Sequence, residues 1–318
     1  MSDVTVGALP PDPMIERREL VQRVARRTLT RRMRASQALV ALCGLALLIA
    51  LIPLFAILYS LVRKGIHWWS IDFFTETPRF PSLINPNDVG GISNAIIGSL
   101  VIDGIAALFA IPIGVVAGLY LSESSSKFAN TLRMTAEIMT GLPSILLGIF
   151  AYQMLVVGFD QWGIKLPGIG FSGLAGSFAI GVLMIPIIMK AAETSLRAVP
   201  TPIREAGLAL GARKEVVARR VVIPTALPGL ITAVLLALSR AVGETAPILW
   251  VIGASTVVSW DPRNEMASMP LQIFQSATSP YTSLREEAWG IALLLVVVVL
   301  VINLGSRLLA TWLQRERR

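Results

Sequence analysis

The stretch TPIREAGLALGARKEVVARRVVIP, residues 201–224, is a hydrophilic segment between two long apolar runs. Thr201 followed by Pro202 predicts a helix start, with Thr201 as the N-cap and proline at the first helical position. Gly211 is placed to end that helix, because glycine readily adopts the left-handed conformation that follows a helix C-terminus. Residues 213–220 predict a second short helix. The stretch therefore predicts a loop that carries two short helices.

The first of these helices is amphipathic. Four small or apolar residues share one of its faces at helical spacing: Ile203, Ala206, Gly207 and Leu210. Such a face can lie on a lipid surface, or it can fit a hydrophobic groove on a partner protein. Periodicity alone does not distinguish the two.

Apolar runs long enough to cross a bilayer flank this loop and recur along the chain, since about 20 apolar residues suffice. Only 15% of the 318 residues are charged, against about 25% in soluble domains. The sequence therefore predicts an all-α integral membrane protein with six transmembrane helices, near residues 36–62, 94–121, 131–157, 172–190, 227–253 and 287–311.

The basic residues predict the orientation of these helices, because cytoplasmic loops carry an excess of Lys and Arg. With the N-terminus inside, six of the 28 Lys and Arg residues lie outside: Arg63, Lys64, Arg79, Lys165, Arg263 and Arg285. The expected order is a basic cytoplasmic tail (1–35), the first span, an external loop (63–93), a core of five spans (94–311) with a cytoplasmic loop at 191–226, and a cytoplasmic tail (312–318). The formal charge of +8 then reflects topology, and no nucleic-acid partner is expected.

Composition also limits the chemistry. The chain has one cysteine, Cys43, and one histidine, His67, so no intrachain disulfide and no multi-ligand zinc or other metal site is expected. His67 stands beside two tryptophans and is interpreted as an interfacial residue. The basic tail is compatible with a surface-bound amphipathic helix and equally with a solvated tail.

Two charges interrupt the apolar run LALSRAVGETAPILWVIG, residues 236–253. Arg240 and Glu244 are four residues apart, which places them on one helix face. Charged side chains within a span turn toward the bundle interior or a pore. Three interpretations stay open: a charge pair that joins two helices or satisfies itself, an anion site in which the guanidinium binds oxyanion oxygens, and a proton or gating role for Glu244.

Three further charged residues lie in or near the spans. Lys190 ends its span and can reach the interface or join Arg240 as a point charge. Glu137 is about one turn from Arg133, so a local ion pair is expected there. Asp103 has no local partner in the sequence, and we expect a hydrogen bond to another helix.

The loop also matches a known pattern. Glu205, Ala206 and Gly207, then Gly211 after three residues, and Ile223 and Pro224 at the end resemble the EAA signature of ABC-importer permeases. The resemblance implies that these six residues belong to coupling helices that dock into ATPase subunits. The chain carries no Gly-x-x-x-x-Gly-Lys-Ser/Thr motif, so ATP, with Mg, is expected on partner ATPase subunits and no cofactor on this chain.

Five further stretches, GGISNAIIGSL, GLPSILLGIFAYQ, IPIIMKAAETSLRAVP, ALSRAVGETAPIL and MPLQIFQSATSP, resemble the A-type permease subunit of phosphate-specific importers over about residues 90–311. The resemblance implies the type I ABC-importer permease fold, in a bacterial cytoplasmic membrane with both termini cytoplasmic. It implies a C-type permease partner, two ATPase copies, an external phosphate-binding protein and inorganic phosphate as substrate.

The resemblance further implies that Arg240 lies in the translocation path. Lys190 stands where the family usually has arginine, which weakens a bidentate role there.

Three other functions are alternatives to phosphate import. A permease for sulfate or molybdate would carry the same loop. An ion-coupled secondary transporter would need no ATPase-docking loop and would often show an inverted repeat, and no clear repeat is present. A membrane-embedded enzyme would need a larger catalytic cluster than Arg240 and Glu244.

Overall fold

The computed structural model describes residues 13–79, 81, 88–160 and 163–315. The start of the expected N-terminal tail, before Pro13, and the last three residues of the expected C-terminal tail lie outside the described residues. The chain forms two compact units, Met1–Ser60 and Leu61–Arg318. Each unit is described by itself.

Most of the first unit is helix. Helix α1 (Pro13–Gly65) is continuous from within the expected tail through the first expected span. The boundary expected at residues 35 and 36 is therefore not a break in secondary structure. Between Arg32 and Tyr59 nearly every side chain is exposed. This exposure is expected for an apolar helix that lies in lipid.

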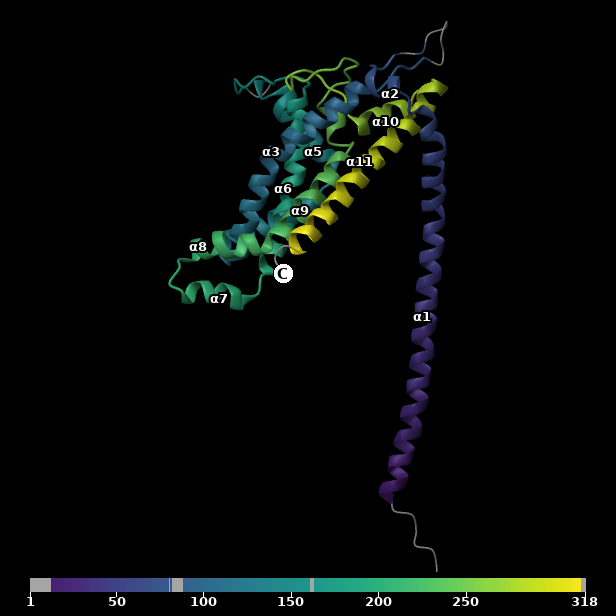
Figure 1. The fold of residues 1–318 in the computed structure, drawn as a ribbon, viewed down its shortest axis with the longest axis vertical. Helices are drawn as coiled ribbons and strands as arrows, with labels where there is room; N and C mark the ends of the chain where they lie inside the picture. Colours follow the sequence, from purple (N-terminus) through teal and green to yellow (C-terminus); the bar gives the residue numbers. More distant parts are fainter. Residues whose placement is uncertain (1–12, 80, 82–87, 161–162, 316–318) are drawn as a thin grey trace, which may run out of the picture. The chain divides into compact units, whose positions relative to one another are not determined.

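The second unit is a bundle of helices (Figure 1). Its α-helices after α1 are α2 (Ile71–Thr75), α3 (Ser93–Glu123), α4 (Lys127–Gly141), α5 (Ser144–Ala151), α6 (Gly173–Arg197), α7 (Thr201–Ala209), α8 (Lys214–Val217), α9 (Ile223–Val242), α10 (Met269–Ala277) and α11 (Thr282–Arg315). Short 3-10 helices occur at Ile66–Trp68 and Ile248–Trp250, and π-helical segments occur at Tyr152–Val157 and Ala218–Val222.

Five helices of the described chain are long and apolar enough to cross a membrane. A sixth span results if α4 and the helix that follows it are counted as one bent pair. The described residues form no β-strand beyond two isolated bridges. The predicted all-α fold is thus confirmed, with five or six segments that could span a membrane where six were expected.

Helices α3 and α6 pack along their length through small residues. Ala106, Ala110, Gly114 and Gly118 recur every four residues on the buried face of α3. A Cβ added at Gly114 would lie 2.7 Å from the Ile188 Cβ, and one at Gly118 would lie 2.7 Å from the Ala192 Cβ. In lipid, where the hydrophobic effect does not drive helix association, close backbone approach through small residues supplies the packing energy.

One expected helix boundary is wrong. The span expected over residues 227–253 ends as a helix at Val242, and the rest of that range, after Gly243, is not α-helical. Helix α6 continues to Arg197 and α9 begins at Ile223, so both helices extend into the loop expected over residues 191–226. Hydropathy marks the apolar length of a segment, and it does not locate the helix end.

The short helices lie at opposite ends of this unit. In Figure 1, α7 and α8 lie at the same end as the C-terminal part of α11, whereas α2 and α10 lie at the other end. Helix α10 falls between the spans expected at residues 227–253 and 287–311. Its N-cap is Ser268, whose side chain accepts a hydrogen bond from the Leu271 backbone N–H.

Candidate functional site

A break between α4 and α5 shapes the candidate substrate site. Leu142 and Pro143 separate the two helices, and the chain bends there by 101°. Proline provides no backbone N–H and disfavours a helical conformation for the residue before it. Leu142 accordingly has extended backbone angles. The span expected at residues 131–157 is therefore two helical pieces with a sharp corner.

Lys190 reaches this corner from α6. Its Nζ donates to the Thr140 Oγ1 at 3.3 Å. Thr140 is in the last turn of α4, and its hydroxyl lies 3.0 Å from the backbone oxygens of Ala136 and Glu137. Lys190 is therefore held against the end of α4 and is only partly exposed.

Arg240 reaches the same corner from α9. It lines a cavity of about 70 Å³ together with Met139, Thr140, Leu142, Ser144, Leu147, Leu183 and Ile187. Thr140 thus connects the two predicted cations, because it lines the cavity with Arg240 and accepts a hydrogen bond from Lys190. Residues that are 50 positions apart in sequence meet at one place.

Arg240 and Glu244 form an ion pair, with the Arg240 Nε 3.1 Å from the Glu244 Oε1. The expectation that both residues lie on one helix face is wrong, because α9 ends at Val242 and Glu244 lies in the following non-helical segment. The Arg240 side chain is 58% exposed and that of Glu244 is 16% exposed. The guanidinium therefore remains partly accessible to solvent, although its Nε already bonds to Glu244.

The donors around this cavity suit an anion. Arg240 lines the cavity, Lys190 binds Thr140 at its edge, and Ser144 brings a hydroxyl group, whereas the Thr140 hydroxyl already donates to backbone oxygens of α4. Ser144 is also the first residue of α5, whose N-terminal N–H groups carry partial positive charge. Sequence reasoning missed Thr140 and Ser144, although Pro143 between two apolar runs was a visible signal of a helix break.

The loop after α6 carries the predicted coupling residues. Helix α7 follows Pro200 as its N-cap, so Thr201 is the first helical residue and the expected Thr201 N-cap is wrong. Gly211 has φ of +78°, the left-handed conformation that favours glycine, and its N–H bonds to the Leu208 carbonyl at 2.9 Å. The turn predicted at Gly211 is present.

The two helical pieces of this loop touch at Gly207. A Cβ added there would lie 3.1 Å from a methyl group of Val217, so a small residue is needed. The second piece is α8 followed by a π-helical turn that leads into α9, in place of the single helix expected at residues 213–220. Pro224 lies in the first turn of α9, where proline is tolerated.

Helix α7 is open to its surroundings. None of its residues is buried, and its small and apolar side chains Ile203, Ala206 and Leu208 are exposed, as is Leu210 just after it. Leu210 is 89% exposed. An apolar surface of this kind on a short helix fits a groove on another protein.

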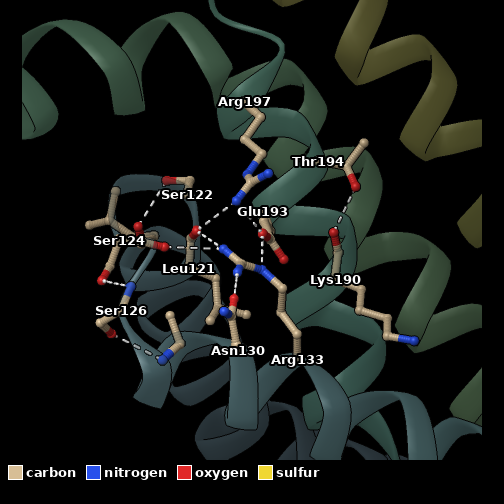
Figure 2. A network of polar contacts seen from close by, with 12 residues as sticks. Leu121, Ser122, Ser124, Ser126, Asn130, Arg133, Lys190, Glu193, Thr194 and Arg197 are labelled. Carbon is tan, nitrogen blue, oxygen red and sulfur yellow. Dashed lines mark hydrogen bonds and ion pairs between the residues drawn. The ribbon is translucent and has the colours of Figure 1, made fainter.

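A polar network joins the middle of α4 to the C-terminal parts of α3 and α6 (Figure 2). Arg133 of α4 pairs with Glu193 of α6 at 2.7 Å, and it donates to the Leu121 carbonyl of α3 at 2.6 Å. Arg197 also binds Glu193, at 3.0 Å, and donates to the Leu121 carbonyl at 3.2 Å. Two arginines thus satisfy a backbone oxygen near the C-terminus of α3, where helix carbonyls lack partners.

Two sequence expectations about buried charges are corrected. Arg133 pairs with Glu193, and within the described residues Glu137 forms no ion pair with it. Asp103, in α3, was expected to hydrogen-bond across helices; the described part of the chain gives its carboxylate no hydrogen bond or ion pair. Among the described residues no group of three His, Cys, Asp or Glu side chains could hold a metal ion.

The arrangement is that of a membrane transport component, with a bundle of spans, a charged cavity at a helix break and an exposed loop helix at one end. A family model described as binding-protein-dependent transport system inner membrane component matches residues 110–318. The chain belongs to this family and, within it, to the PstA group of phosphate transport permeases.

Individual relatives support this assignment. The chain is 38% identical to the phosphate transport system permease protein PstA of Haemophilus influenzae over 276 residues, which are 86% of this chain and 93% of the relative. It is 34% identical to PstA 1 of Mycobacterium tuberculosis, covering 85% of each chain.

A solved bacterial alginate ABC transporter, in complex with a pentasaccharide-bound periplasmic protein, shares the fold. Its TM-score is 0.61 at 15% identity, and the match covers 86% of this chain and 93% of that one. The protein is therefore a multi-pass permease of the inner membrane with the ABC-importer permease fold.

Proposed function

We propose that this chain is the A-type permease subunit of an ATP-driven importer of inorganic phosphate, and that it forms half of the translocation pathway. One observation carries the proposal: Arg240 and the Thr140-bound Lys190 converge on the break between α4 and α5 in a chain that belongs to the PstA group. The relatives are named as phosphate transport permeases, which favours phosphate over sulfate or molybdate.

Within this proposal Arg240 binds phosphate oxygens in the pathway, and Glu244 competes for the same guanidinium when phosphate is absent. Coulomb attraction between Arg240 and the anion is stronger in the low-dielectric membrane than in water. Glu244 keeps the binding weak enough for release. Lys190 adds a second, more flexible positive charge, since an ammonium has no planar fork.

The partners follow from the same proposal. The loop formed by α7 and α8, with Glu205, Ala206, Gly207, Gly211, Ile223 and Pro224, docks with soluble ATPase subunits, of which two copies bind ATP and Mg. This chain itself hydrolyses nothing. A C-type permease completes the pathway, and an external phosphate-binding protein delivers the anion.

Reconstitution tests the function. The tagged chain should co-purify with a soluble ATPase and a second permease, and proteoliposomes with this complex and the binding protein should import labelled phosphate in an ATP-dependent way. Unlabelled phosphate should compete, and sulfate and molybdate should not. Import of sulfate or molybdate without import of phosphate would contradict the assignment of the substrate.

The orientation gives a separate prediction. In a Cys43→Ala background, Leu210→Cys should not react with a membrane-impermeant thiol reagent in intact cells, because α7 and both termini face the cytoplasm. Val257→Cys, at a side chain that is 68% exposed in a segment expected outside, should react readily. Opening the membrane and removing the ATPase should make Leu210→Cys reactive. Labelling of Leu210→Cys from outside would overturn the topology.

Gly211 gives a prediction about docking. Gly211→Val should weaken association with the ATPase, because a β-branched residue is strained by about 1–2 kcal/mol at the positive φ of this turn. A Cβ added at Gly211 has no neighbouring atom within 4 Å. The variant therefore tests backbone strain and not a steric clash. Gly211→Asn is the matched control, since asparagine tolerates this conformation. Equal co-purification of ATPase by the two variants would show that the turn does not position the docking helix.

A further inference from the structure

Helix α7 has little apolar packing to hold it against the membrane helices. None of its residues is buried. The nearby hydrophobic cluster is built from α6, α8, α9 and the residues between them, with Leu196, Val217 and Val222 among its members, and it contains no residue of α7. A docking helix that moves with a partner must nevertheless transmit that movement to the membrane helices. Polar contacts between α7 and these helices can provide the connection.

Arg204 supplies such contacts, to two spans at once. Its guanidinium forms an ion pair with the Glu123 carboxylate, at the last residue of α3. A second nitrogen of the same group donates to the Leu196 carbonyl, in the last turn of α6, at 2.6 Å. The Arg204 side chain is 20% exposed and that of Glu123 is 38% exposed, so solvent screens the part-buried bond to the Leu196 carbonyl less than it screens the ion pair.

The two points that Arg204 contacts belong to one rigid platform. Arg133 and Arg197 join the Leu121 carbonyl of α3 to Glu193 of α6, as Figure 2 shows. Above this platform α3 and α6 are packed too closely for a side chain at Gly114 or Gly118. A displacement of these two helix ends therefore moves α3 and α6 together.

One wall of the substrate cavity is part of α6. Leu183 and Ile187 line the cavity with Arg240, and Lys190 follows one turn later on the same helix. A shift of α6 consequently changes the spacing between the two cations and the helix break. The path from α7 to the cavity is continuous: Arg204, the end of α6, then Ile187 and Leu183.

We propose that Arg204 is the positioning residue that transmits the movement of α7 to α3 and α6, so that ATP hydrolysis and transport are coupled through its guanidinium. The inference rests on the proposed function. It assigns Arg204 a role distinct from docking, because its side chain points to the membrane helices of this chain. Rigid-body movement of packed elements is a common way of transmitting a conformational change. Here the Arg204 guanidinium would connect the moving helix α7 to α3 and α6.

The test is the number of phosphate ions imported per ATP hydrolysed, measured in proteoliposomes with assembled complex isolated on a sizing column. Arg204→Gln should leave assembly and ATP hydrolysis near those of the unmodified complex and should lower this ratio by about ten-fold or more, as expected for the loss of charge-assisted hydrogen bonds. Arg204→Lys, which keeps the charge, should restore part of the ratio.

Arg213→Gln is the matched control. It removes the same charge from an exposed position of the same loop, and no bond between its side chain and α3 or α6 is found among the described residues. Its ratio should stay unchanged. Glu123→Gln removes the negative charge of the ion pair without altering α7, and the double variant with Arg204→Gln should be no worse than Arg204→Gln alone, because both act through one contact.

An unchanged ratio for both Arg204→Gln and Glu123→Gln would overturn the inference. A parallel loss of hydrolysis and ATPase association would also overturn it, because Arg204 would then be part of the docking surface. If the unmodified complex hydrolyses ATP and imports no phosphate, the proposed function fails instead. The two failures are therefore distinguishable.

Discussion

Arg240→Gln should reduce phosphate uptake to the background of liposomes without the complex, a loss of about 100-fold. Hydrogen bonds to charged groups contribute about 1.5–3 kcal/mol each, and every 1.4 kcal/mol of lost transition-state stabilisation is a factor of about ten in rate. Glutamine keeps one donor group and removes the charge. The anion would then meet the membrane without the cation that offsets its desolvation.

Two further variants separate charge from geometry at this position. Arg240→Lys should retain little uptake, because an ammonium cannot bind two phosphate oxygens in the planar way that a guanidinium does. Glu244→Gln should impair transport less than Arg240→Gln, since it frees Arg240 from the ion pair at 3.1 Å and so slows release. The measurement is uptake of labelled phosphate in proteoliposomes.

Arg263→Gln is the matched control for Arg240→Gln, because it removes one positive charge from an exposed position away from the cavity. Its uptake should be near normal. Assembly is scored beside uptake on a sizing column. Normal uptake by Arg240→Gln would refute the anion site, and loss of uptake through loss of assembly would make the Arg240–Glu244 pair a purely structural one.

Gly118→Leu should abolish the assembled permease. A Cβ at this position would lie 2.8 Å from the Met189 carbonyl oxygen and 3.0 Å from the Glu193 nitrogen, both of which are backbone atoms that cannot rotate away. Overpacking commonly costs about 1–3 kcal/mol, and separation of α3 from α6 also disturbs the network around Glu193. The amount of protein that survives mild detergent extraction as a complex measures the effect.

Gly104→Leu is the control on the same helix. A side chain there meets no atom within 4 Å, so the variant should be extracted and assembled at nearly the unmodified level. The two variants share the same gain in volume and the same gain in helix propensity. If Gly118→Leu assembled as well as Gly104→Leu, close approach of α3 and α6 would not be what holds the bundle together.

The class of the protein could be predicted from local features of the sequence. Apolar length predicts spans, and the described chain has five apolar helices of sufficient length and one bent helix pair. The combination of Glu205, Gly211 and Pro224 at fixed spacing indicated the loop that α7 and α8 form. The four-residue spacing of Arg240 and Glu244 left an ion pair between them as one of three interpretations, and this pair forms although the helix ends between the two residues.

Contacts between distant residues could not be predicted in this way. Arg133 has Glu137 as its nearest acidic neighbour in sequence, yet it pairs with Glu193, 60 positions away. Glu286 and Glu287 are adjacent and chemically alike, yet Glu286 is exposed and Glu287 is completely buried. The rotation of each helix about its axis decides such differences, and hydropathy carries no information on it.

The sequence by itself therefore determined the helical membrane class, the loop that α7 and α8 form, and the two charged residues in the last turn of α9 and just beyond it. Only the tertiary structure decided that Lys190, Thr140 and Arg240 share one corner, and that Arg204 contacts both α3 and α6. The physical reason is that spans and spacings depend on neighbours along the chain. The meeting of three helices depends on a 101° bend at Leu142 and Pro143 and on the small-residue packing of α3 against α6.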